Sequence, residues 1–209
     1  MTHSRPLMFD RAILALDMEM SGLNPKTDHI LSIGFVPITQ DGIPLGQAEH
    51  ILLRSPKSVA HSATIHHIRD CDLADTGAEP DEILPTLLQQ LKGHVLITHG
   101  GDIDADFLSQ AHQRYFGTRW RPTRLDTQDF ARRRLGTDHL PTANNLSLRH
   151  CRTHYHLPTW RAHHALSDAI ATAELFQAQL RDAFPQDPNP PWKNVQKSFS
   201  SLLMRWGVK

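Results

Sequence analysis

The sequence lacks three features: a cysteine pattern, a long apolar run and a net charge. Among 209 residues only Cys71 and Cys151 are cysteines, far apart and without a CxxC pair. Two free thiols in a reducing compartment are therefore expected rather than a disulfide or a zinc site. No apolar run is long enough to cross a membrane, and the polar start, Met1 to Asp10, lacks the apolar core of a signal peptide. We therefore expect a cytoplasmic protein with no membrane partner.

The formal net charge of zero hides a contrast along the chain. Residues 1–104 hold seven Lys and Arg against fourteen Asp and Glu, whereas residues 105–165 hold ten against four. An acidic part joined to a basic part suits a metal site beside a phosphate-binding surface. Chance variation along a chain gives such a contrast equally well, so charge alone does not decide the function.

Hydrophobic spacing changes from strand-like to helix-like along the chain. Strands are predicted at Arg11–Asp17, His29–Ile38 and roughly Leu45–Leu53, with a hairpin turn at Asp41-Gly42. Helices are predicted over Asp81–Leu91, Asp104–Tyr115, Leu125–Leu135, Asn144–His154 and from near His163 to before Pro185, with a further strand at His94–Thr98. Strands first, and then helices with a strand between them, predict an α/β fold whose mixed β-sheet is flanked by helices.

The chain divides after residue 184 by composition. Residues 1–184 form the expected main domain, 185–191 a Pro-rich linker, and 192–209 a segment that stands apart from the domain. Five apolar residues of this segment share one face of a predicted amphipathic helix: Trp192, Val195, Phe199, Leu202 and Trp206. That face either packs onto the domain or onto a second copy of the chain, or it docks a protein partner or nucleic acid.

Acidic residues follow two of the predicted strands. Side chains alternate along a strand, so Asp17 and Glu19 point to the same face. Most D-x-E triplets are solvated surface acids, but this one ends an apolar strand, where active sites are common. After the strand at His94–Thr98 come Asp102, Asp104 and Asp106, and position alone does not choose among them, since one of them can cap the next helix.

A histidine and an acid flank the start of the long helix. If His163 precedes this helix and Asp168 lies within it, both side chains can face one cleft. Histidine exchanges protons near neutral pH, and a carboxylate binds a hard cation. One histidine among fifteen can also precede a helix by chance.

Three motifs in order resemble the histidine-bearing type of the DEDD superfamily of 3′–5′ exonucleases, which includes polymerase proofreading subunits, ribonuclease T and oligoribonuclease. The first is Asp17-Met18-Glu19-Met20-Ser21-Gly22-Leu23, similar to D-x-E followed by T/M, T/S, G and L. The second, His99 to Asp104, is similar to H-N-x-x-F-D and selects Asp104. The third, H-x-A-x-x-D, is met by His163, Ala165 and Asp168. Ile65 to Ile68 and Leu125-Asp126-Thr127 resemble two further family features, and the resemblance covers about residues 11–180.

The resemblance implies a ribonuclease H-like fold, with residues 1–184 as an exonuclease domain, and cleavage with two divalent metal ions, Mg²⁺ or Mn²⁺. Asp17, Glu19 and Asp168 would hold one ion, Asp17 would bridge to the second, and Asp104 would support it. His163 would be the general base. Met20, Leu23 and His66 would contact the terminal nucleotide of a single-stranded DNA or RNA 3′ end. A polymerase or a second copy of the chain is the expected protein partner, through residues 192–206.

Other functions stay open from the sequence. A glycosidase also uses two carboxylates, but acids at i and i+2 of one strand are set too close for its usual pair. A silent nucleic-acid-binding or polymerase-accessory module would have lost a ligand, and none is lost here. An oligoribonuclease-like enzyme would act on short RNA. Eight arginines are candidates for phosphate contacts, although charged runs are usually solvated: Arg119, Arg121, Arg124, Arg132, Arg133, Arg134, Arg149 and Arg152.

Overall fold

The computed structural model describes residues 5–59, 62–135 and 146–199. Within these ranges five strands form one mixed sheet in the order β3-β2-β1-β4-β5. The central strand β1 runs antiparallel to β2 and parallel to β4, while β2 and β3 are antiparallel and β4 and β5 parallel. The strands are β1 (Ala12–Met20), β2 (Ile30–Pro37), β3 (Glu49–Leu52), β4 (His94–Thr98) and β5 (Arg124–Asp126). The predicted mixed sheet flanked by helices is confirmed.

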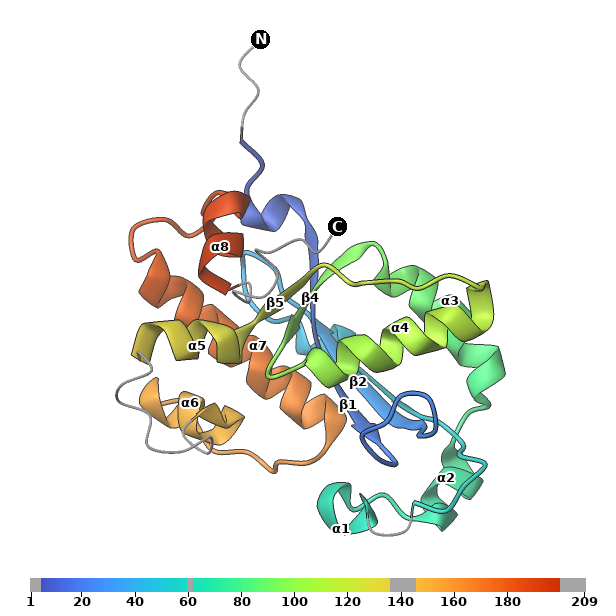
Figure 1. Ribbon diagram of the computed structural model, residues 1–209. Helices are drawn as coiled ribbons and strands as arrows, with labels where there is room; N and C mark the ends of the chain where they lie inside the picture. Colours follow the sequence, from blue (N-terminus) through green and yellow to red (C-terminus); the bar gives the residue numbers. More distant parts are fainter. Residues whose placement is uncertain (1–4, 60–61, 136–145, 200–209) are drawn as a thin grey trace.

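Helices cover both faces of the sheet, with α5, α7 and α8 on one side and α3 and α4 on the other (Figure 1). The α-helices of the described ranges are α1 (Ala63–His66), α2 (Asp70–Thr76), α3 (Pro80–Leu91), α4 (Asp102–Phe116), α5 (Thr127–Leu135), α6 (Leu148–His154), α7 (Ala165–Ala183) and α8 (Trp192–Phe199). None of these helices has the length and apolar character that a membrane crossing requires.

Strand β1 is buried on both faces and separates two hydrophobic clusters. Ile13 and Ala15 pack with residues of α7 and α8, whereas Leu14 and Leu16 pack with residues of α3 and α4. This period of two is what strand geometry dictates. A strand buried on both faces reads as a continuous apolar run, which explains why its start was clear in the sequence.

Two predicted elements differ from the structure. The third strand was expected from Leu45, but Leu45–Gln47 forms a 3-10 turn and β3 begins at Glu49. The helix expected from Leu125 begins at Thr127, because Arg124–Asp126 forms the edge strand β5 beside β4. The short helices α1 and α2 were not predicted. Asn144, the expected start of the helix that became α6, lies outside the described residues.

The expectation that the chain after residue 191 stands apart from the domain is wrong for α8. Trp192, Val195 and Phe199 are buried in the same cluster as α5 and α7, and the Phe199 ring stacks on Phe130 with centroids 4.6 Å apart. The preceding Pro-rich segment is held as well, since the Met8 N–H donates to the Pro190 carbonyl over 2.9 Å. The apolar face of α8 is therefore covered by this chain itself. Leu202 and Trp206 lie outside the described residues.

Candidate active site

Strand β1 carries the first two acids to the end of the sheet where α7 begins. Asp17 and Glu19 follow Ile13 and Ala15 in the strand's alternation, so their side chains leave the sheet on the α7 side. Asp17 lies opposite Gly34 of β2 in the antiparallel register. The register shifts between Glu19 and Met20, which ends regular pairing just after the acid pair.

Gly34 lets the start of α7 approach the sheet beside Asp17. A Cβ atom at this position would lie 2.2 Å from the backbone nitrogen of Leu166, closer than any real Cβ contact. Only glycine leaves room for this approach. The first turn of α7 therefore lies directly over the strand pair that carries Asp17, and Asp168 belongs to that turn.

Asp17, Glu19 and Asp168 form one carboxylate cluster. Each offers an oxygen, and these three oxygens lie within 4.8 Å of one another. Carboxylate oxygens are hard donors, which Mg²⁺, Mn²⁺ and Ca²⁺ prefer. Metal ions that prefer soft thiolate ligands fit this site less well. The donor set therefore fits the divalent cation that the sequence implied.

Asp104 follows β4, the strand on the other side of β1 from β2. It lies in the first turn of α4, which follows β4, and only 6% of its surface is exposed. It is not part of the three-residue cluster, but its charge acts on Asp17. Of the three candidates after His94–Thr98, Asp104 is the buried one, whereas Asp102 and Asp106 are exposed.

The loop before α4 is organised by Asp126. The carboxylate of Asp126 accepts the backbone N–H groups of Gly100 and Gly101, each over 3.0 Å, and the hydroxyl of Thr98 over 3.2 Å. Gly100 has φ of 67°, in the left-handed region that glycine adopts without strain. Glycine therefore fits the place where the family pattern has asparagine. Arg124 donates to the Gly101 carbonyl and to Asp102 and so fixes the same turn.

Crowding of acids raises their pKa values. Burial, and then the charges of Asp104, Asp168 and Glu19, raise the pKa of Asp17. Burial, and then Asp168 and Asp104, raise the pKa of Glu19 to about 7. Burial raises the pKa of Asp104 to about 7 against the opposing charge of Arg124. Such a group of carboxylates is costly without a cation, which supports a metal-binding role.

His163 and His164 have different environments at the start of α7. The backbone N–H of His163 donates to Asp168 Oδ2 over 2.8 Å, and the residue has φ of 63°, a strained backbone for a side chain of this kind. Its side chain is exposed. His164 is the N-cap of α7, with Nδ1 accepting from Ser167 N, and its ring lies 4.4 Å from the ring of His50. The backbone of His163 is thus tied to the acid cluster, while His164 has a local structural role.

Of the three residues expected to contact a nucleotide, two lie at the end of β1 and in the loop after it, and His66 lies in α1. Met20 is the last residue of β1 and is partly buried. Leu23, in the loop that follows, is 79% exposed, which is unusual for a large apolar side chain. His66 ends α1 and is buried, its Nδ1 accepts from the Ile68 N–H, and its Nε2 has no hydrogen-bond partner among the described residues. An exposed leucine and an unpartnered imidazole N–H suit a ligand-binding role.

The expectation that the basic segment binds phosphate is wrong for Arg124 and Arg152. Arg124 and Arg152 are buried and bound to the protein's own carbonyl groups. Arg132 pairs with Asp129, and Arg134 pairs with Asp182 over 3.1 Å. Arg133 donates to the Lys197 carbonyl of α8. The exposed members of the set are Arg119, Arg121, Arg132, Arg134 and Arg149, and they stay candidates for phosphate contacts.

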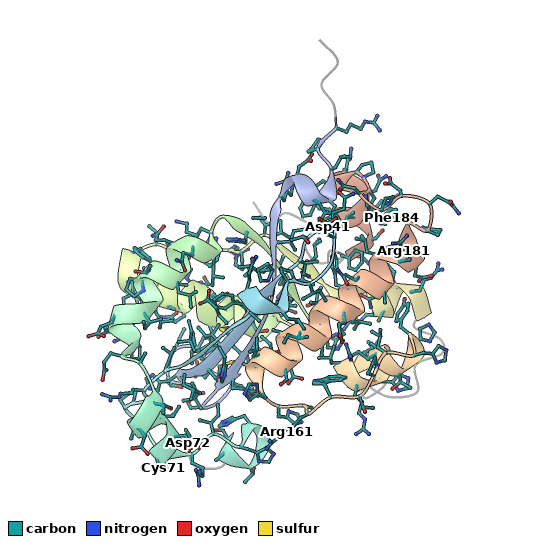
Figure 2. All side chains as sticks on the ribbon, turned by 180° about the vertical axis from the view of Figure 1, so that it is seen from behind. Asp41, Cys71, Asp72, Arg161, Arg181 and Phe184 are labelled. Carbon is teal, nitrogen blue, oxygen red and sulfur yellow. The ribbon has the colours of Figure 1, made fainter. Side chains whose placement is uncertain are left out.

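One residue at the site escaped the sequence analysis. The indole N–H of Trp160 donates to Asp168 Oδ1 over 2.6 Å. Figure 2 shows the segment that contains it through its neighbour Arg161, at the end of α7 opposite Arg181 and Phe184. A tryptophan in a polar segment three residues before His163 is the only signal that the sequence offered.

Comparison with known proteins agrees with this geometry. The family model RNase_T, described as an exonuclease, matches residues 14–176. PolC-type DNA polymerase III from Thermotoga petrophila is 29% identical over 164 residues, which is 78% of this chain and 11% of the polymerase. The Thermotoga maritima protein of the same name is 27% identical over 80% of this chain and 12% of its own length. The chain thus spans about a tenth of these relatives.

Solved structures of exonuclease I share the fold. One, described as suggesting how processivity is achieved, superposes with a TM-score of 0.69 at 15% identity, covering 84% of this chain and 42% of the other. Exonuclease I from E. coli in complex with a dT13 oligonucleotide gives 0.67 at 16% identity, with the same coverage. The predicted ribonuclease H-like fold is confirmed. Because the family model matches residues 14–176, more than half of the chain, the chain belongs to the RNase_T exonuclease family, within the DEDD superfamily of nucleases.

Proposed function

We propose that this nuclease removes nucleotides one at a time from the 3′ end of a single-stranded nucleic acid, releasing nucleoside monophosphates. The observation that carries the proposal is the cluster of Asp17, Glu19 and Asp168, whose oxygens lie within 4.8 Å of one another. Three carboxylates this close are not the opposed pair of a glycosidase, and a cation explains why they share a site.

In this proposal Asp17, Glu19 and Asp168 would hold one Mg²⁺ or Mn²⁺, and Asp104 would support a second ion together with Asp17. When bound, two such ions stabilise the negative charge that develops on the attacking and leaving oxygens of the phosphodiester. The raised pKa of Glu19, due mainly to burial, falls back when a cation replaces its proton.

His163 takes the proton from the attacking water as general base. Its backbone N–H is bound to Asp168, and its exposed side chain can turn toward the cluster. His164 is bound at the N-terminus of α7 instead and does not share this role.

Leu23, Met20 and His66 contact the terminal nucleotide and thereby select a free end. Leu23 is exposed just beyond the acid pair, and the unpartnered Nε2 of His66 is available to donate a hydrogen bond. A non-catalytic accessory module is the weaker alternative, because all four acids are present. A substrate of short RNA, in the manner of oligoribonuclease, is the alternative that keeps the chemistry.

The test is a cleavage assay with Mn²⁺ and end-labelled single-stranded DNA and RNA of several lengths. A 3′-phosphate should block degradation, a 5′ block should not, and a closed circular strand should stay intact. Asp17→Asn should abolish cleavage without unfolding the protein. Asp41 is an exposed acid that lies near Arg181 and Phe184, far from Arg161 (Figure 2), so Asp41→Asn should leave cleavage unchanged. Cutting of the circle, or full activity of Asp17→Asn, would reject the proposal. The DNA and RNA arms together decide the substrate.

The relatives named PolC-type DNA polymerase III suggest a polymerase as protein partner. The apolar face of α8 is not free to bind such a partner, since Trp192, Val195 and Phe199 are buried within this chain. A polymerase or a second copy of the chain would have to bind elsewhere on residues 192–206 or on another surface. Size-exclusion chromatography with light scattering separates a homodimer from a monomer that awaits a partner.

A further inference from the structure

The connection between α6 and α7 holds both oxygens of Asp168. Trp160 donates its indole N–H to Oδ1 over 2.6 Å, and the His163 backbone N–H donates to Oδ2 over 2.8 Å. Each carboxylate oxygen has two lone pairs, so these donors leave one on each oxygen for another ligand. Because Asp168 is only 9% exposed, water offers little competition for the same oxygens.

Trp160 is itself fixed in place by Arg152. The guanidinium carbon of Arg152 lies 4.3 Å from the centre of the Trp160 ring, a cation–π contact. Arg152 is only 2% exposed, and it donates to the Ala171 carbonyl of α7 over 2.6 Å and to the Pro158 carbonyl over 2.8 Å. Glu174 pairs with it over 2.7 Å. One buried arginine thus joins α6, the connection and α7 beneath the tryptophan ring.

This arrangement is more than ordinary packing. Burying a guanidinium is unfavourable unless its donors are satisfied, and the Nε of Arg152 has no partner among the described residues. The Trp160 ring therefore lies on a costly buried group whose contacts with Pro158, Ala171 and Glu174 tie the connection to α7.

We propose that Trp160 is a positioning residue for the metal site: its indole N–H sets the rotation of the Asp168 carboxylate so that free lone pairs face Asp17 and Glu19. The inference rests on the metal-binding role given to these acids under the proposed function. Donors outside a metal's ligand shell orient the ligands, and their loss commonly lowers metal affinity about 10- to 100-fold. Trp160 does not touch substrate or the reacting atoms.

The decisive variant is Trp160→Phe, which keeps an aromatic ring over Arg152 but removes the indole N–H together with part of the ring's volume. The matched control is Trp120→Phe, a partly buried tryptophan of the α3/α4 cluster. Mn²⁺ binding to the full-length protein is measured without substrate, by electron paramagnetic resonance of free Mn²⁺. We expect the apparent Kd to rise about tenfold or more in Trp160→Phe, on the scale of lost outer donors, and to stay unchanged in Trp120→Phe.

Further readouts separate positioning from a merely structural role. The melting temperature in EDTA should fall in Trp160→Phe by no more than in Trp120→Phe, which loses the same volume, and saturating Mn²⁺ should restore the kcat of the Trp160→Phe variant. If Trp160→Phe does not fold, the indole N–H signals of the isotope-labelled wild type, assigned by replacing the other three tryptophans in turn, decide the question. Addition of Mg²⁺ should then shift the Trp160 signal more than the others.

Unchanged Mn²⁺ affinity in Trp160→Phe, or a Trp160 indole signal that ignores Mg²⁺, overturns the inference. An equal loss of affinity in Trp120→Phe also overturns it, because the effect would then be general. Since Mn²⁺ binding is measured without nucleic acid, the proposed exonuclease activity can fail while this inference holds, and the two failures are distinguishable.

Discussion

Removing the charge of Asp104 should stabilise the metal-free protein at alkaline pH while destroying its activity. Asp104 is buried in the first turn of α4, and its pKa is raised to about 7, mainly by burial, with Arg124 opposing and Asp126 adding to the rise. An ionised carboxylate here repels Asp17 when no cation is present. Asp104→Asn keeps the shape of the side chain and removes the charge.

The metal-free protein loses stability at high pH because its folded and unfolded states bind different numbers of protons. The unfolded chain releases the Asp104 proton near the ordinary aspartate pKa of 3.8, whereas the folded chain keeps it to about pH 7. Between these values the folded state binds more protons, so the free energy of unfolding falls as pH rises. One pKa unit is worth about 1.36 kcal/mol, so the loss from Asp104 reaches at most about 4 kcal/mol above pH 7. Glu19 adds to the loss in the same window, but by less than its pKa alone suggests, because it is partly exposed.

The assay is urea unfolding in EDTA at pH 5.5 and at pH 8. The wild type should be less stable at pH 8 than at pH 5.5. Asp104→Asn should lose less stability over this range and be the more stable protein at pH 8. Mn²⁺ should stabilise the wild type more than the variant. Asp106→Asn, an exposed acid of the same helix, controls for changing an aspartate in α4. If Asp104→Asn is less stable than the wild type at pH 8, or equally dependent on pH, the electrostatic account of this site is wrong.

Two further predictions concern the start of α7. His163→Ala should lower kcat ~10²-fold or more, the usual effect of losing a general base, with Mn²⁺ binding unchanged, whereas His164→Ala should change kcat much less; the reverse order in a steady-state assay would reject the assignment of the base. Gly34→Ala places a Cβ 2.2 Å from the Leu166 nitrogen, so α7 must shift: we expect a loss of about 1–3 kcal/mol in urea unfolding, as for overpacked sites, together with weaker Mn²⁺ binding. Gly46→Ala, where nothing lies within 4 Å of the added atom, is its control, and equal effects of the two changes would contradict the reasoning.

Part of the carboxylate cluster could be expected from the sequence. Strand alternation puts Asp17 and Glu19 on one face, whereas the choice of Asp104 and Asp168 came from the resemblance to the exonuclease family. Their approach in space was not predictable in the same way. The approach of α7 to β1 and β2 depends on Gly34, where a Cβ atom would clash with Leu166. The hydrophobic pattern of the strand gives no sign that this glycine is needed.

Strand β5 was missed because its charged residues are buried. In β5, Arg124 and Asp126 flank Leu125, and all three are buried, so hydrophobic spacing saw only one apolar residue and extended the following helix over it. The expectation that α8 stands apart from the domain was wrong for another reason. A Pro-rich segment usually reads as a linker, but here its Pro190 carbonyl is bound to the N-terminal segment, and it returns the chain to the core.

Two buried arginines of residues 105–165 have a different use from the phosphate contact that composition suggested. Arg124 holds the turn before Asp104 through the Gly101 carbonyl, and Arg152 holds the connection before His163 through the Pro158 carbonyl. Each buried cation thus fixes a segment that brings an acid or the general base to the site. Charge placed this way can oppose the repulsion among the acids, as Arg124 does for Asp104, while a surface arginine is screened by solvent. These two buried arginines therefore help to assemble the acidic site, and the exposed arginines of the same stretch stay candidates for phosphate contacts.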